Sequence, residues 1–242
     1  MNENLTELVV VIDKSGSMDS VTNDAIGGFN AFLKSQKEAP GEAKMTVVLF
    51  DTTYSFYAAN VDVKSVNPLD NNSYKPQGGT ALYDAVGTAI DEIGKKLADM
   101  EEKDRPSKVV FAILTDGEEN SSKKYNRQKV FNQIATQRDT YKWEFLFLAA
   151  GKEAFTAGES LGMAKTKMAM FKNDAKGNTA SYDALAAYTT AYRGTKGDFE
   201  TMELSRSINL QSVVNESLAK LEAVKPPEKA PVLPGVETEK KT

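Results

Sequence analysis

The fold is decided by the stretch VVVIDKSGSM, residues 9–18. Its first half belongs to a continuously apolar run, residues 8–12, which is typical of a strand buried on both faces of a parallel sheet. The run ends at Asp13, and Ser15, Gly16 and Ser17 follow closely. Because ligands of open α/β sheets lie beyond the carboxyl ends of the strands, this turn is the first candidate for a functional site.

Apolar β-rich runs alternate with amphipathic segments along the rest of the chain, which predicts an α/β sheet with crossover helices. Further strands are expected at residues 44–51, 54–63, 109–114, 143–150 and 167–171. Helices are expected at residues 23–36, 81–100, 127–138, 153–161 and 182–192. The second and third strands are too close for a helix between them, so we expect an antiparallel hairpin at a sheet edge. We therefore predict a doubly wound, six-stranded, mostly parallel sheet with one antiparallel edge strand and helices on both faces.

The pattern divides the chain into three parts. Residues 1–197 are predicted to form the domain, and residues 198–224 a helical extension whose apolar members are Ile208, Val213, Leu218 and Leu221. Residues 225–242 combine four prolines with charges and threonines. Such a composition cannot bury enough apolar surface to fold by itself, so we predict a disordered tail.

Composition excludes several kinds of chemistry. The 242 residues include no cysteine and no histidine. Thiolate zinc sites, iron–sulfur clusters, cysteine nucleophiles and imidazole ligands are therefore excluded, together with the Ser-His-Asp triad. Oxygen ligands, lysine and the backbone remain.

Charge and the amino-terminal sequence indicate the partners and the location. The chain has 30 Lys+Arg against 34 Asp+Glu, a net charge of −4. That charge is of the wrong sign for a nucleic-acid-binding surface. The acidic start lacks the basic and apolar parts of a signal peptide, and no apolar run approaches the length of a membrane span. We expect no nucleic-acid or membrane partner and a cytoplasmic location.

Polar oxygens recur at three predicted element boundaries. Asp13, Ser15 and Ser17 follow the first strand, Thr80 ends a glycine-rich loop before the second helix, and Asp116 follows the strand at 109–114. In a doubly wound sheet the two strands would be neighbours, so Asp13 and Asp116 would face each other. Hydroxyl and carboxylate ligands favour a hard cation, above all Mg²⁺, with Mn²⁺ as the second choice.

Together these residues resemble the von Willebrand factor A family and its metal-ion-dependent adhesion site. The family pattern Asp-x-Ser-x-Ser, then a distant Thr, then a distant Asp, is complete here at Asp13, Ser15, Ser17, Thr80 and Asp116. The flanking segments GGTALYDA (78–85) and LTDGEEN (114–120) are similar to bacterial and phage members, and the resemblance spans residues 5–192. It implies direct coordination by both serines, direct or water-mediated binding by the threonine, and water-mediated contacts from the two aspartates. It also implies that an acidic group of a partner takes the open position.

The resemblance implies a metal-dependent protein–protein binding module whose partner donates an Asp or Glu carboxylate, and not an enzyme. Family members inside cells often work beside ATPases or in assembly complexes. A structural or assembly role, for example in a virion, would use the same ligands. A phosphoryl-transfer enzyme is less favoured, because haloacid-dehalogenase phosphatases carry a second aspartate where this chain has Ser15. The phosphate-loop and dinucleotide fingerprints are also missing from the sequence.

Neighbouring residues carry simpler expectations. Asp13 and Ser15 are expected on a solvent-facing turn, with Ser17, Asp19 or Ser20 capping the first helix. Asp84 is expected to interact with the dipole of the second helix. Solvated charges are expected at Lys14, Glu118 and Glu119.

Overall fold

The structure, a computed structural model, describes residues 1–195 and 207–223. A six-stranded sheet forms its centre, with the strand order β3-β2-β1-β4-β5-β6. The bounds are Asn2–Asp13 for β1, Glu42–Phe50 for β2, Tyr54–Asp62 for β3, Pro106–Thr115 for β4, Glu144–Ala150 for β5 and Met168–Phe171 for β6. Among the strands of the described residues, only the β2–β3 pair is antiparallel. The predicted six-stranded, mostly parallel sheet with one antiparallel edge strand is confirmed.

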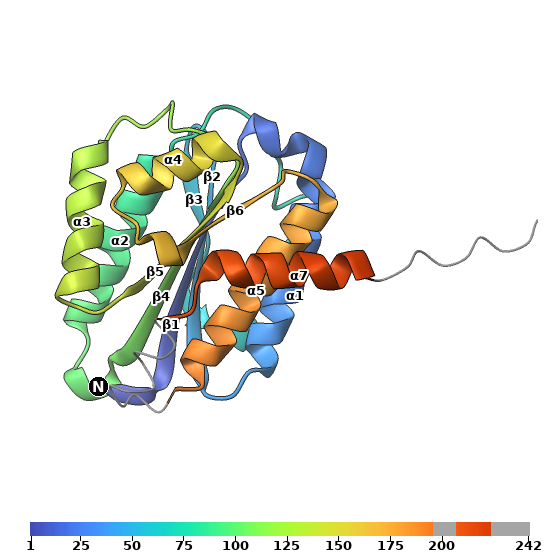
Figure 1. Ribbon diagram of the computed structural model, residues 1–242. Helices are drawn as coiled ribbons and strands as arrows, with labels where there is room; N and C mark the ends of the chain where they lie inside the picture. Colours follow the sequence, from blue (N-terminus) through green and yellow to red (C-terminus); the bar gives the residue numbers. More distant parts are fainter. Residues whose placement is uncertain (196–206, 224–242) are drawn as a thin grey trace, which may run out of the picture.

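Helices cover both faces of the sheet (Figure 1). One face carries α1 (Thr22–Glu38), α5 (Ala175–Arg193) and α7 (Leu210–Ala223), and the other carries α2 (Leu82–Asp99), α3 (Arg127–Asp139) and α4 (Lys152–Ser160). Alternate residues of β1 supply the two cores: Val10 and Ile12 pack on the α1 side, and Val9 and Val11 on the α2 side. This alternation explains why the run at 8–12 is apolar throughout.

Two elements, β1 and α5, begin well before the residues at which the sequence predicts them to start. β1 begins at Asn2 instead of residue 8, because its polar start still pairs with β4, where Asn2 lies opposite Pro106. α5 begins at Ala175 instead of residue 182. Its first turn lacks an apolar repeat, but the Asp174 carboxylate caps it by accepting a 2.8 Å hydrogen bond from the Gly177 amide.

The carboxyl-terminal helix α7 packs against α5 and β6. It buries Leu210 and Val214, and the Gln211 side-chain amide bonds both the amide and the carbonyl of Met170 on the edge strand. The predicted boundary at 197 and the predicted tail at 225–242 lie outside the described residues.

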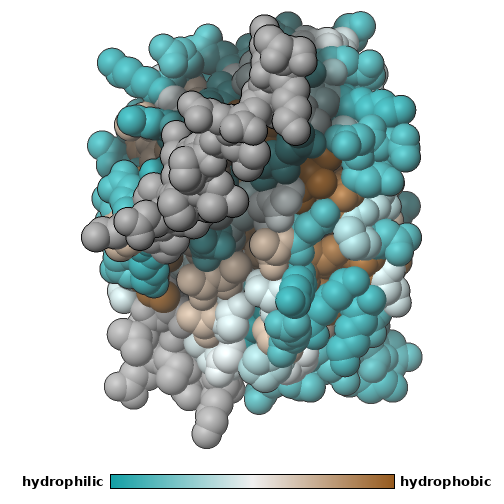
Figure 2. All heavy atoms as spheres, turned by 90° about the vertical axis from the view of Figure 1, so that its right-hand side faces the viewer, coloured by the Kyte–Doolittle hydropathy of each residue, from teal (hydrophilic) through white to brown (hydrophobic). Residues whose placement is uncertain are grey.

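The face that bears α1, α5 and α7 is mostly hydrophilic, with small apolar areas between the polar side chains (Figure 2).

Within residues 1–195 and 207–223, no helix is both long and apolar enough to cross a membrane.

Candidate metal site

The candidate site lies at the carboxyl edge of the sheet, where three segments meet. Asp13 ends β1, Asp116 follows the last residue of β4, and Thr80 closes the loop before α2. Backbone hydrogen bonds join the first and third segments: the Gln77 amide donates to the Lys14 carbonyl at 2.9 Å, and the Gly16 amide donates to the Gly78 carbonyl at 3.1 Å. The segments are therefore held together by the backbone before any side chain contributes.

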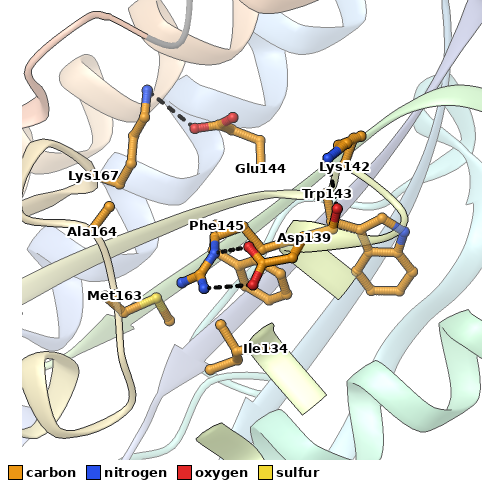
Figure 3. A pocket seen from close by; sticks show the side chains of 10 residues that line it. Ile134, Asp139, Lys142, Trp143, Glu144, Phe145, Met163, Ala164 and Lys167 are labelled. Carbon is orange, nitrogen blue, oxygen red and sulfur yellow. Dashed lines mark hydrogen bonds and ion pairs between the residues drawn. The ribbon is translucent and has the colours of Figure 1, made fainter. Parts of the chain in front are cut away.

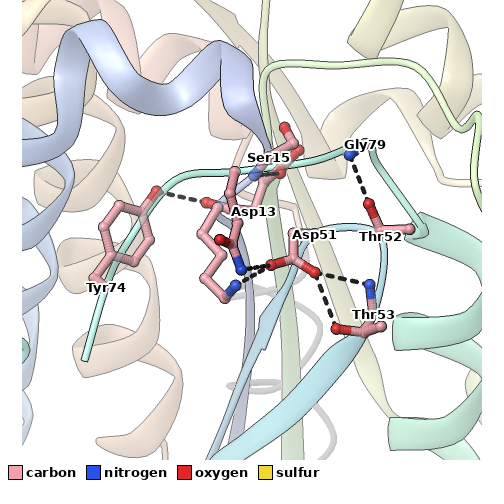
Figure 4. Close-up of polar contacts among 9 residues, drawn as sticks. Asp13, Ser15, Asp51, Thr52, Thr53, Tyr74 and Gly79 are labelled. Atoms are coloured by element: carbon pink, nitrogen blue, oxygen red, sulfur yellow. Dashed lines mark hydrogen bonds and ion pairs between the residues drawn. The ribbon is translucent and has the colours of Figure 1, made fainter. Parts of the chain in front are cut away.

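Two glycines allow the loop before Thr80 to pack closely against Thr52 and Ser121. Gly78 has a φ of 65°, a left-handed conformation that favours glycine, and a Cβ there would collide with the Thr52 hydroxyl. A Cβ on Gly79 would collide with the Ser121 hydroxyl. The Gly79 amide donates to the Thr52 hydroxyl at 2.8 Å, a bond that can be followed in Figure 4.

A chain of hydrogen bonds links three of the predicted ligands. The hydroxyl oxygens of Ser15 and Ser17 lie 3.1 Å apart, and the Ser17 hydroxyl donates to the Asp116 carboxylate at 2.7 Å. The other oxygen of that carboxylate accepts a 2.7 Å bond from the side-chain amide of Asn173, in the loop between β6 and α5. Ser17 is exposed and Asp116 half-buried, so this oxygen cluster is open to solvent.

Thr80 lies beside the turn that carries Asp116. Its amide donates to the Asn120 side chain at 2.8 Å, and its carbonyl accepts from the Asn120 amide at 3.0 Å. A Cβ built on Gly117 would lie 3.1 Å from the Thr80 hydroxyl oxygen. The structure thus brings all five predicted residues to one edge of the sheet.

Asp13 is buried, and the expectation of a solvent-facing turn is wrong for Asp13 and Ser15, which are 0% and 2% exposed. The Asp13 carboxylate accepts a 2.7 Å bond from the Ser15 amide and a 2.5 Å bond from the Thr115 hydroxyl. Asp13 is still part of β1, paired in register with Phe50, and the buried Tyr74 hydroxyl donates to its carbonyl. The strand therefore carries Asp13 into the interior, and the first residues after it that are classed as exposed are Gly16 and Ser17.

Burial makes the site electrostatically unfavourable for its own carboxylates. Desolvation raises the pKa of Asp13 to about 6, against the bonds from Thr115 and Ser15, and the neighbouring Asp116 charge raises it further. Desolvation also raises the pKa of Asp116, although the bonds from Ser17 and Asn173 oppose that shift. A cation between the two carboxylates would stabilise both charged forms.

The donor set fits a hard divalent cation. It consists of hydroxyl and carboxylate oxygens, the ligands that Mg²⁺ and Mn²⁺ prefer. Within residues 1–195 and 207–223, no cluster of three or more His, Cys, Asp or Glu side chains has the geometry of a metal site. Serine and threonine hydroxyls must therefore supply part of any coordination here. The residues that could hold such an ion are Asp13, Ser15, Ser17, Thr80 and Asp116.

Comparison with known proteins agrees with this architecture. No family model and no curated protein matches the chain. Solved structures do match. The manganese-loaded TRAP protein of Plasmodium vivax is 15% identical, with a TM-score of 0.52 over 71% of this chain and 70% of that one. A von Willebrand factor type A protein from Catenulispora acidiphila is 15% identical, with a TM-score of 0.52 over 77% of this chain and 43% of that one.

The chain has the fold of a von Willebrand factor A domain. Proximal thread matrix protein 1 of the mussel byssus was solved with zinc in its metal-ion-dependent adhesion site (MIDAS) motif. It shares this fold at 14% identity and a TM-score of 0.53. The match covers 76% of this chain and 46% of that protein. At such identities the comparison supports the fold, and this chain spans less than half of the mussel and Catenulispora proteins.

Two charged residues near the candidate site, Lys14 and Glu119, are less exposed than the sequence predicts, whereas Glu118 is exposed as expected. The Lys14 ammonium forms an ion pair with Asp51, and its side chain is 14% exposed. Asp51 also accepts bonds from the amide and the hydroxyl of Thr53, as Figure 4 shows. The ion pair with Asp51 therefore accounts for the low exposure of Lys14.

Glu119 and Asp84 hold the loop that follows Asp116. The Glu119 carboxylate accepts bonds from the amides of Tyr83, Ser121 and Ser122, so it joins the start of α2 to this loop. Asp84 accepts from three successive amides, those of residues 123–125, beyond its expected interaction with the helix dipole. The expected cap of α1 is not formed by a side chain: Val21 is its N-cap residue, and a 3₁₀ helix precedes it.

Sequence reasoning missed several residues that shape the site. Thr115 and Asn120 lie within the segment LTDGEEN, so attention to their side chains could have found them. Tyr74 lies in a polar loop, where an aromatic residue signals a buried anchor. Asn173 gives no such signal, because only the fold brings the loop after β6 to Asp116.

Proposed function

We propose that this protein is a metal-dependent protein-binding module. Its divalent cation, Mg²⁺ or Mn²⁺, would receive an Asp or Glu carboxylate of a partner protein. The observation that carries the proposal is the hydrogen-bonded chain from Ser15 through Ser17 to Asp116 at a solvent-open edge. The manganese-loaded and zinc-occupied structures of the same fold support a divalent ion.

The physical basis is incomplete charge compensation. Two of the five candidate ligands are carboxylates, and one of them, Asp13, is fully buried with both oxygens in hydrogen bonds. The hydroxyls contribute no charge, so a bound cation would keep much of its attraction for an external anion. When bound, the cation would supply a strong charge-assisted contact at an open position.

Binding is favoured over catalysis by the environment of Asp13. A phosphatase of the haloacid-dehalogenase kind needs an aspartate that can attack a phosphorus atom. Here the Asp13 side chain is 0% exposed, and the Ser15 amide and Thr115 hydroxyl occupy its two oxygens. A structural or assembly role would use the same metal-mediated contact, and so would a role beside an ATPase. The cytoplasmic location stays a prediction.

A peptide-display experiment tests the binding role. Random peptides are captured on the immobilised protein in Mg²⁺ and released with chelator. We expect the captured peptides to share an acidic residue, and replacing it by its amide should abolish capture. The Ser17→Ala variant is the matched negative control and should capture no such peptides, because it lacks one candidate metal ligand. Its fold should be unchanged, since Ser17 is exposed and the substitution leaves no cavity. Capture that persists in chelator, or that needs no acidic residue, would contradict the proposal.

A further inference from the structure

A second candidate site lies at the opposite edge of the sheet. A cavity of about 310 Å³ opens where α3 ends and β5 begins, bordered by the segment that leads to β6. The first residue of β5, Glu144, lines it, whereas the metal site lies beyond the carboxyl ends of β1 and β4. Because these strands are parallel, the two sites lie at opposite edges. The volume is at the lower end of the range for small-molecule pockets.

The floor of the cavity is apolar and aromatic. Trp143, Phe145, Ile134 and Met163 line it, each at most 7% exposed. Trp143 and Phe145 stack with ring centroids 6.2 Å apart and planes 27° apart. Figure 3 shows Met163 and Ile134 lying near Phe145. Flat rings with an adaptable methionine beside them suit a flat apolar group.

The cationic side chains at the rim differ in how fully they are paired within the protein. Lys167 pairs with Glu144 at 3.1 Å, and both contact the Tyr188 hydroxyl, so this buried triad is satisfied within the protein. Arg138 pairs with Asp139, but the two side chains are 38% and 62% exposed. The pair is bidentate, at 2.7 and 3.0 Å, and the Nη1 atom of Arg138 donates to the Gly162 carbonyl at 2.9 Å. Nη1 and Nη2 each carry a second hydrogen, so the partly exposed guanidinium can still donate to an anion in the cavity.

The backbone and side chain of Lys142 also support an anion site in this cavity. Its φ is 60°, a left-handed conformation that is uncommon for residues other than glycine, asparagine and aspartate. Its ammonium donates to the Asp139 carbonyl at 2.6 Å, which holds the positive charge over the cavity rim. The lysine costs conformational energy that glycine or asparagine would avoid, which motivates a role for its charge.

We propose that this cavity binds a small amphiphilic anion. Its flat apolar body would lie on the Trp143–Phe145 floor, and its carboxylate or sulfonate would meet Arg138 and Lys142. The site is independent of the metal edge, so the two assignments stand or fall separately.

Trp143 is the single tryptophan of the chain, so its fluorescence reports on this cavity. The probe is anilinonaphthalene sulfonate, a flat aromatic anion that accepts energy from tryptophan. We expect saturable quenching of Trp143 in the folded full-length protein, unchanged by chelator. Phenylnaphthylamine, which lacks the sulfonate, should bind more weakly.

Charge variants separate anion recognition from apolar binding. Lys142→Asn removes the charge and suits the left-handed backbone, so the fold should persist while the sulfonate binds about fivefold more weakly. Arg138→Gln should act in the same direction, and Lys103→Gln, at a residue 74% exposed and outside the cavity, should have no effect. The proposal is overturned if saturable quenching is absent, or if both cavity variants bind the sulfonate as tightly as wild type.

Discussion

Strand β1 carries two buried carboxyl groups, Glu7 and Asp13, and each is 0% exposed. Glu7 accepts bonds from the Thr46 hydroxyl at 3.0 Å and the Asn60 side-chain amide at 2.6 Å. Asp13 accepts from the Thr115 hydroxyl and the Ser15 amide. Desolvation raises the pKa of both, to about 7 for Glu7 and about 6 for Asp13.

The difference between the two carboxyls lies in what surrounds them. Asp13 is followed by Ser15 and the exposed Ser17, and Asp116 approaches from β4. Glu7 is enclosed between strands, where Thr46 of β2 and Asn60 of β3 contact it. A buried acid with a raised pKa is therefore insufficient evidence for a metal site. Convergent oxygens at an open sheet edge distinguish Asp13 from Glu7.

The largest expected effect is on metal affinity. Asp13→Asn should weaken Mg²⁺ binding at least ~100-fold, about 3 kcal/mol, because it removes a charge beside the ion. The fold should survive, since the new amide can donate to the Thr115 hydroxyl, which also lies 3.3 Å from the Gly117 carbonyl. Titration calorimetry measures both this variant and Glu7→Gln, whose affinity should equal that of wild type. An equal loss of Mg²⁺ affinity in the two variants would show that Asp13 has no special role in metal binding.

Glu7 should instead control the dependence of stability on pH. Its folded pKa of about 7 lies above its ordinary value of 4.5, so the folded state favours the protonated form. This contribution is complete below pH 4.5 and is lost as the pH rises through 7. The loss is on the order of 3 kcal/mol.

Denaturant unfolding of wild type and Glu7→Gln between pH 4 and 8 measures this contribution. The variant should lack this part of the decline, and its new amide can be accommodated because the Asn60 side-chain oxygen has no partner among the described residues. Parallel stability curves for the two proteins would show that Glu7 does not titrate in this range.

The smallest expected effect concerns Asn173, which orients Asp116. Asn173→Ala removes the 2.7 Å bond to the carboxylate and should weaken Mg²⁺ binding roughly tenfold, as loss of residues that orient metal ligands does. Asn126→Ala is the control. The Asn126 side chain caps α3 by accepting from the Lys129 amide, and it lies away from the metal site. If Asn126→Ala lowers affinity as much as Asn173→Ala, the effect is one of general stability.

The fold was predictable because its signals are local. The continuous run at 8–12 predicts a central strand, and the short link between the second and third strands predicts their antiparallel pairing; the structure confirms both. The start of α5 was missed because Lys176, Gly177 and Asn178 carry no apolar repeat. Its cap at Asp174 was the available signal.

The site was predictable in composition but not in depth. The spacing of Asp13, Ser15 and Ser17 indicates convergent oxygens, but it says nothing of where burial ends. The burial of Asp13 depends on long-range pairing with β2 and on Tyr74. The contact of Asn173 with Asp116 joins residues 57 positions apart, which no local pattern encodes.

Anomalous diffraction from crystals soaked in Mn²⁺ would locate the bound ion. We expect one strong peak bound directly by the hydroxyl oxygens of Ser15 and Ser17, close to Asp116, and no peak beside Glu7. The same soak of Asp13→Asn crystals should show the peak lost or greatly reduced. A wild-type map with no peak at this edge, or with its main peak elsewhere, would contradict the assignment of the metal site.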